Sequence, residues 1–128
     1  MKKPFVLIAA IVAVVGLGTA VAVAKETTNV GTSVKLEFRY RNAPAFLGSV
    51  KARNGHCQKG RRVIVTRDNE RVYAGKSNDR GKYKIIVALR DIYGGYLFRA
   101  VANERTITKN NGDKIVCKRG RSKPWTSF

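Results

Sequence analysis

The sequence predicts an all-β protein: a single β-sandwich of about seven strands with one disulfide, after an N-terminal signal peptide. Two observations predict the fold class. From residue 32 onwards, polar and apolar residues alternate in short runs separated by glycine, asparagine and aspartate, and no run of useful length has helical spacing. The chain has 128 residues, which leaves room for one domain only.

The first of these runs extends from Val34 to Tyr40, where lysine, glutamate and arginine alternate with apolar residues, as in a strand with one wet face. Gly48, within the second run, indicates a bulge or a close backbone approach. Pro124 limits the ladder hydrogen bonds of the last run. After the first, the expected strands are 46–50, 63–67, 72–76, 83–87, 96–101, 106–108, 114–117 and an edge strand within 122–128. Turns are expected at 54–55, 68–70, 78–81 and 110–113.

The N-terminal residues have the features of a secretory signal peptide. Two lysines follow Met1, residues 4–24 carry no charge, and Ala22-Val23-Ala24 fits a small-x-small cleavage site. The alternative is an uncleaved anchor, since a membrane span needs roughly 20 apolar residues. We therefore expect membrane contact only if the signal is retained, and a secreted or extracytoplasmic domain in either case. The expected organisation is a signal peptide over 1–24, a flexible leader over 25–31 and the sandwich over 32–128.

Cys57 and Cys117 are the only cysteines, and both lie in the part expected outside the cytoplasm. An even count in that compartment favours a structural disulfide, and two cysteines allow one intrachain pairing. A zinc site would need about four ligands, whereas a redox pair usually has Cys-x-x-Cys spacing. These two alternatives therefore have less support than the disulfide.

The middle of the chain carries four short motifs in a fixed order: Phe46-x-Gly48-x-Val50, Cys57-x-x-Gly60-Arg61-x-Val63-x-Val65, Ser77-x-Asp79-x-Gly81-x-Tyr83-x-Ile85 and Gly95-Tyr96. This order resembles the carboxypeptidase regulatory-like, or transthyretin-like, β-sandwich domains, and above all their small secreted bacterial members with two cysteines. The resemblance covers about residues 46–101 and implies an immunoglobulin-like or transthyretin-like sandwich. It also implies an accessory or adhesive module with no catalytic residues.

Within that resemblance the matching residues have structural roles. We expect Asp79 to cap its turn through the side chain and Gly81 to adopt positive φ there. Arg61-Arg62 departs from the family, which usually has a small residue before the third strand.

No catalytic or metal-binding constellation stands out. His56 is the only histidine, and no serine lies in a G-x-S-x-G elbow that could pair with it. The aspartates lie mostly in predicted turns, where they favour local hydrogen bonds, and no calcium-binding loop is present. We expect no enzyme activity, no cofactor and no metal.

The basic residues are the feature most open to a binding role. Residues 25–128 contain 24 basic and eight acidic residues, a net charge of +16 over 104 residues. Such a charge favours acidic partners. One cluster is Lys35, Arg39 and Arg41 on the wet face of the first strand. The disulfide would bring two further clusters together as a polyanion-binding end: Lys59, Arg61 and Arg62, and Lys118, Arg119, Arg121 and Lys123. The alternative is a dispersed basic surface with no specific ligand.

Two functions follow as expectations. The first is a non-enzymatic secreted or cell-surface module that acts as a binding or accessory domain at the cell envelope, or contacts an extracellular protein. The second is an extracellular polyanion-binding protein for an acidic cell-wall polymer, a polysaccharide or DNA. Nucleic acid is not expected as the physiological ligand, because the chain carries an export signal. Binding that weakens steeply with salt would favour the second function.

Overall fold

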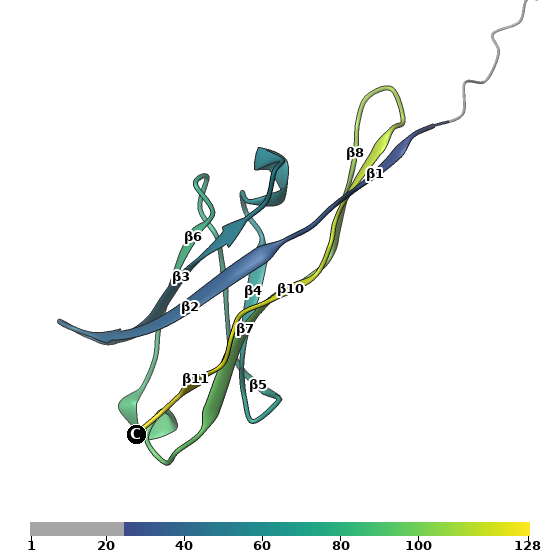
Figure 1. The fold of residues 1–128 in the computed structure, drawn as a ribbon. Helices are drawn as coiled ribbons and strands as arrows, with labels where there is room; N and C mark the ends of the chain where they lie inside the picture. The colour runs from purple at the N-terminus through teal and green to yellow at the C-terminus, as the bar shows by residue number, and fades with distance from the viewer. Residues whose placement is uncertain (1–24) are drawn as a thin grey trace, which may run out of the picture.

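A computed structural model of the chain describes residues 25–128 (Figure 1). The predicted signal peptide, 1–24, lies outside these residues. Two short 3-10 helices accompany the strands, and neither can span a membrane. The strands are β1 Thr27–Val30, β2 Ser33–Tyr40, β3 Pro44–Lys51, β4 Arg62–Arg67, β5 Glu70–Lys76, β6 Lys82–Ile86, β7 Leu97–Ala102, β8 Arg105–Thr108, β9 Lys114–Cys117, β10 Gly120–Arg121 and β11 Trp125–Thr126. The 3-10 helices are η1 Gly55–Cys57 and η2 Leu89–Asp91.

Two of the three sheets form a sandwich. One has the order β2-β3-β6, and the other has the order β10-β7-β4-β5, with β11 also pairing with β7. Neighbouring strands in both sheets are antiparallel. The all-β class and the predicted strands are therefore confirmed. The last strand, expected within 122–128, forms as β11, whereas β10, on the other side of Pro124, was not predicted.

The core lies between these two sheets, where the predicted alternation turns apolar side chains inward. Phe46 of β3 and Phe98 of β7 are fully buried, with ring centroids 5.0 Å apart. Trp125 of β11 packs on Phe38 of β2, also at 5.0 Å, and this contact joins the C-terminal segment to the opposite sheet. The other buried members are Val34, Val50, Val63, Val65, Tyr83, Ile85, Val87, Ile92, Ala100 and Ala102.

The close approach predicted at Gly48 is present. Tyr83 of β6 is paired with Gly48 in the register, and its hydroxyl donates a hydrogen bond across β3 to the carbonyl oxygen of Lys35 in β2. Burial, with the charge of Glu37 as a second cause, raises the pKa of the Tyr83 hydroxyl, so it stays protonated as a donor. Only a residue without Cβ leaves room for this ring.

We expect Gly48→Ala to destabilise the fold by about 1–3 kcal/mol, because a Cβ there would lie 2.6 Å from Tyr83 Cζ and overlap the Lys35 carbonyl. The matched control is Gly31→Ala, since no atom lies within 4 Å of a Cβ at position 31. Urea unfolding, followed by the fluorescence of Trp125, measures both variants. Equal midpoints for the two variants would contradict this account of Gly48.

The third sheet, β1-β9-β8, extends from one end of the sandwich (Figure 1). Its strand β1 corrects the expectation of a flexible leader over 25–31. Residues 27–30 pair in parallel with β9, and the Lys114 backbone N–H donates to the Glu26 carbonyl at 2.8 Å. Val30 is buried beside Ile115 and the disulfide. The sequence does not predict this strand, because only one of its four residues is buried and the polar side chains show no alternation with apolar ones.

The predicted turns form, with one change of residue. Gly81 has φ of 79°, as expected, but Asn78 caps this turn in place of Asp79. The Asn78 Oδ1 accepts hydrogen bonds from the backbone N–H groups of Arg80 and Lys82 at 2.9 and 3.0 Å. At positions 68 and 69 the backbone has positive φ, as in the tight two-residue hairpins that favour Asp and Asn.

Candidate polyanion-binding surface

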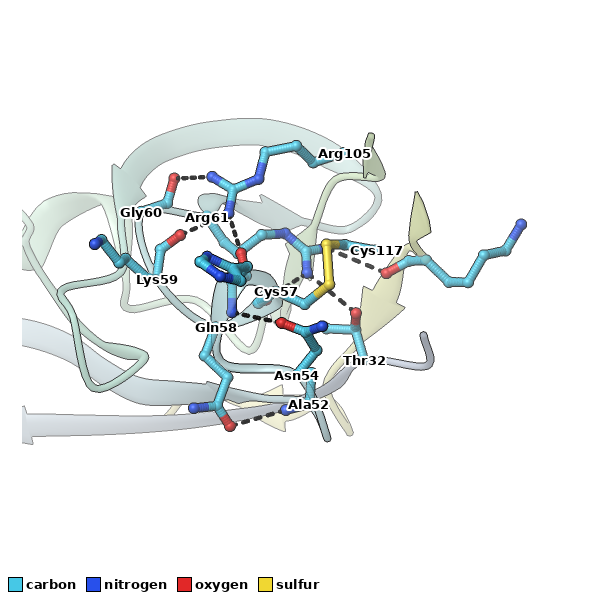
Figure 2. The surroundings of a disulfide bond; sticks show 12 residues. Thr32, Ala52, Asn54, Cys57, Gln58, Lys59, Gly60, Arg61, Arg105 and Cys117 are labelled. Carbon is cyan, nitrogen blue, oxygen red and sulfur yellow. Dashed lines mark hydrogen bonds between the residues drawn. A yellow bond between two sulfur atoms is a disulfide. The ribbon is translucent and has the colours of Figure 1, made fainter. Parts of the chain in front are cut away.

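The predicted disulfide is present and joins the sandwich to the third sheet. Cys57, at the end of η1, is bonded to Cys117, at the end of β9, with their Cα atoms 5.3 Å apart (Figure 2). Both cysteines are fully buried, and they pack with Val30 and Ile115. The bridge therefore brings the segments of the two predicted basic clusters together.

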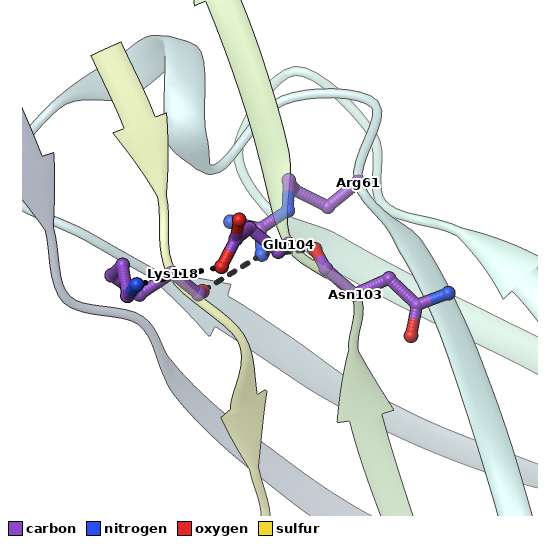
Figure 3. A network of polar contacts seen from close by, with 4 residues as sticks. All are labelled: Arg61, Asn103, Glu104 and Lys118. Carbon is purple, nitrogen blue, oxygen red and sulfur yellow. Dashed lines mark hydrogen bonds and ion pairs between the residues drawn. The ribbon is translucent and has the colours of Figure 1, made fainter.

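Arg61 lies at the centre of this junction. Its Nη1 donates to the Cys57 carbonyl at 2.7 Å and to Thr32 Oγ1 at 3.1 Å. Its Nη2 donates to the Asn103 carbonyl at 2.6 Å and to the Lys118 carbonyl at 3.1 Å (Figures 2 and 3). These four acceptors belong to the β1–β2, β3–β4, β7–β8 and β9–β10 connections. One side chain therefore holds four loops at the disulfide end.

The prediction that Arg61 belongs to a polyanion-binding surface is wrong. Its exposed fraction is 0%, so a ligand in solvent cannot reach the guanidinium. Burial, with the positive charge of Arg105 as a second cause, lowers its pKa. Arginine nevertheless remains protonated in proteins, so the charge is stabilised by carbonyl and hydroxyl oxygens. Arg61 is therefore a structural arginine of the disulfide end.

A second arginine that the sequence did not single out supports the same loop. Arg105 of β8 donates from Nη1 to the Gly60 carbonyl at 3.1 Å and from Nη2 to the Lys59 carbonyl at 2.8 Å. It also donates to the carbonyl of His56. Nothing in its sequence context distinguishes Arg105 from the other basic residues, because its partners lie more than 40 positions away.

The other six residues of the predicted surface are exposed, but they do not form one cluster: Lys59, Arg62, Lys118, Arg119, Arg121 and Lys123. Lys118 pairs with Glu104 at 3.5 Å (Figure 3). Arg121 pairs in register with Val101, and Trp125 pairs with Phe98, so the C-terminal segment runs back along β7. Lys123 is thereby carried along the sandwich, away from the disulfide.

The structure instead gathers basic residues on the outer face of β2-β3-β6. The register places Lys35, Ser49 and Lys82 in one row across the three strands. The next row contains Glu37, Leu47 and Lys84, and the rows beyond add Lys51 and Arg39. We call this set the basic face; it consists of Lys35, Arg39, Lys51, Lys82 and Lys84. Arg41, expected beside Lys35 and Arg39, borders an adjoining hollow with Arg39 and Lys84.

The middle of the basic face is low. Ala45 and Ser49 of the central strand point outward, yet their exposed fractions are only 2% and 5%, because longer side chains on β2 and β6 cover them. A hollow of about 330 Å³ lies at Ser49, and its lining includes Lys35, Lys51 and Lys82. The basic side chains thus form the walls of a shallow trough whose lining on the central strand includes Leu47 and Ser49.

Few of the positive charges are neutralised. Across residues 25–128 two ion pairs form, and on the basic face only Arg39 takes part, with Glu37 at 3.1 Å. Lys35, Lys51, Lys82 and Lys84 have no acidic partner among the described residues. A phosphate or carboxylate ligand would therefore meet three unpaired ammonium groups around the trough and a fourth, that of Lys84, beside it.

Sequence reasoning found Lys35 and Arg39 but missed the contribution of β6. The alternation of Lys82 and Lys84 with apolar residues was visible, so their outward direction was predictable. The alternation does not reveal that β6 pairs with β3, so that β3 is the central strand between β2 and β6.

The single histidine of the chain and the two aromatic residues Tyr73 and Trp125 occupy structural positions. His56 is exposed in η1, where its backbone N–H donates to Asn54 Oδ1 at 2.9 Å. No group of three or more His, Cys, Asp or Glu suited to a metal occurs within residues 25–128. The Tyr73 hydroxyl donates a hydrogen bond to Asp91 Oδ2 and accepts one from the Ala88 N–H. Burial is the main cause that raises the pKa of this hydroxyl. Trp125 packs into the core on Phe38.

Comparison of this chain with protein-family models, with curated proteins and with solved structures gives no match.

Proposed function

We propose that this chain is a non-enzymatic, extracytoplasmic β-sandwich module that binds an acidic polymer through its basic face. The observation that carries the proposal is a set of four lysines without acidic partners on one sheet face. Lys35, Lys51 and Lys82 line the trough, and Lys84 lines the adjoining hollow. The expected ligand class is a linear polyanion such as an acidic cell-wall polymer or polysaccharide.

The spacing of the lysines supports an extended ligand. Alternate residues of a strand lie about 7 Å apart on one face, so Lys82 and Lys84 present charges at that interval along β6. Lys35 of β2 lies across the central strand from Lys82, and Lys51, on the central strand, lies in the adjoining row. A chain with repeated negative charges can therefore contact several lysines at once, whereas a single small anion contacts one or two.

The extracytoplasmic location is supported by two features. The N-terminal residues have signal-peptide features, and a buried disulfide is a bond that persists in oxidising compartments. The resemblance to transthyretin-like domains supports a binding role over a catalytic one, since such modules are accessory or adhesive. Export also makes an envelope polymer a better candidate than nucleic acid.

The test compares purified protein of residues 25–128, which contain every strand described, with a variant in which Lys35, Lys82 and Lys84 are changed to Ala. Each is titrated with an acidic cell-wall polymer, an acidic polysaccharide and duplex DNA at low and near-physiological salt. We expect one polymer to bind the parent at physiological salt. We expect the variant to lose at least about tenfold in affinity and to show a shallower salt dependence, because fewer counterions are released.

The matched control changes Lys76, Arg80 and Lys109 to Ala. It removes the same net charge from exposed positions outside the basic face. If both triple variants weaken binding equally, or if all three polymers bind weakly and lose binding with salt, the charge is generic and the proposal fails.

A further inference from the structure

The two sheets of the sandwich differ in width by one strand. Because β10 and β11 follow one another along β7, their sheet has four strand positions, whereas β2-β3-β6 has three. At one side of the sandwich β5 contacts β6. At the other side β2 contacts β7, β10 and β11. The wider sheet therefore extends past the narrower one beside β2, which is an edge strand within residues 25–128.

A groove of about 470 Å³ follows this edge. Its first wall is the run of five consecutive residues 33–37 of β2, and its second wall is formed by Arg121, Lys123, Pro124 and Trp125. Consecutive strand residues point to opposite faces of a sheet. A groove lined by five in a row therefore lies along the backbone edge of β2 and not over either face. We call it the edge groove.

The β2 backbone offers pairing groups to the edge groove. β2 pairs with β3 alone, and no other backbone hydrogen bond among residues 25–128 reaches Ser33–Tyr40. The outward N–H and C=O groups of an edge strand are the groups that an added strand uses. The volume of the groove also lies in the range of ligand-binding clefts.

The charges around the edge groove favour an acidic ligand. Lys35, Arg121 and Lys123 line it against a single acidic residue, Glu37, which pairs with Arg39. A second copy of this chain is a poor occupant, because residues 25–128 of each copy carry a net charge of +16 and charged edge strands repel one another. An acidic segment complements the same charges, and the apolar wall of Pro124 and Trp125 accommodates its alternate side chains.

We propose that the edge groove binds an extended acidic peptide segment of a partner protein, which adds as a fourth strand beside β2. Backbone pairing with β2 supplies the affinity. The salt-dependent preference for acidic side chains comes from Arg121 and Lys123 on the opposite wall. This site is separate from the basic face proposed above, with which it shares only Lys35.

The test uses a synthetic eight-residue peptide of alternating glutamate and valine, added to purified protein of residues 25–128. Calorimetry measures its affinity at near-physiological salt, and NMR-detected hydrogen exchange reports on the backbone amides of 33–37. Two control peptides are matched in length: one has lysine in place of glutamate, and the other is N-methylated at every residue. We expect binding of the unmodified acidic peptide only, with slower exchange in β2.

Paired variants separate this site from the basic face. Arg121→Ala with Lys123→Ala should weaken peptide binding by about fivefold to tenfold, in line with two partly exposed charge contacts. Lys82→Ala with Lys84→Ala removes the same charge and should leave peptide binding unchanged. The proposal is overturned if the acidic peptide does not bind, if the N-methylated peptide binds equally well, or if exchange at 33–37 is unaffected. Polymer binding by the parent can succeed or fail independently of these outcomes.

Discussion

Replacing Arg61 with Ala is expected to destabilise the protein by about 3–5 kcal/mol, the cost typical of removing one member of a buried charged network. The change removes four hydrogen bonds at once and leaves three buried carbonyl oxygens and a hydroxyl without their donor. It also leaves a cavity at the point where four connections meet. Because small domains have a total stability of about 5–15 kcal/mol, this single change should shift the urea midpoint strongly.

The neighbouring arginine provides the control. Arg62 is exposed on β4, so Arg62→Ala should stay within about 0.5 kcal/mol of the parent. Arg61→Lys is a second variant: it keeps the charge but cannot reproduce the planar pair of nitrogens, so its stability should lie between the parent and Arg61→Ala. If Arg61→Ala unfolds at the parental midpoint, Arg61 does not hold these loops together.

Removing the disulfide is expected to cost about 4 kcal/mol, because the bridge closes a loop with a sequence separation of 60 and restricts the unfolded chain. The variant has Cys57→Ser and Cys117→Ser, and urea unfolding under the same conditions measures it. Intact mass provides a direct check on the parent. The mature protein should begin at Lys25 and weigh about 2 Da less than the dithiol form, because each cysteine loses one hydrogen.

A free-thiol signal from the folded parent would show that the bridge is absent, and equal midpoints for parent and double variant would show that it adds no stability.

The two largest effects should also be coupled. The Cys57 carbonyl accepts a hydrogen bond from Arg61, so loss of the bridge loosens one of the acceptors that Arg61 holds. We therefore expect the combined variant to lose less stability than the sum of the two separate losses.

The candidate site was partly predictable. Lys35 and Arg39 were expected on a wet strand face, and they lie on the basic face. Lys82 and Lys84 were visible as outward residues of their own strand, but their position beside Lys35 depends on β3 pairing with both β2 and β6. For Arg61 the prediction failed because a basic residue next to Arg62 in a loop is normally exposed, and only the meeting of four distant connections makes its burial favourable.

The sequence by itself determined the fold class, most of the strands and the pairing of Cys57 with Cys117. These features depend on local alternation, on turn residues and on a cysteine count that allows one intrachain bridge. Tertiary structure alone decided that residues 27–30 form β1, that Arg61 is internal, and that β2 remains an edge facing the C-terminal segment. The physical reason is common to all three: each depends on a partner far along the chain, which a period of two residues cannot specify.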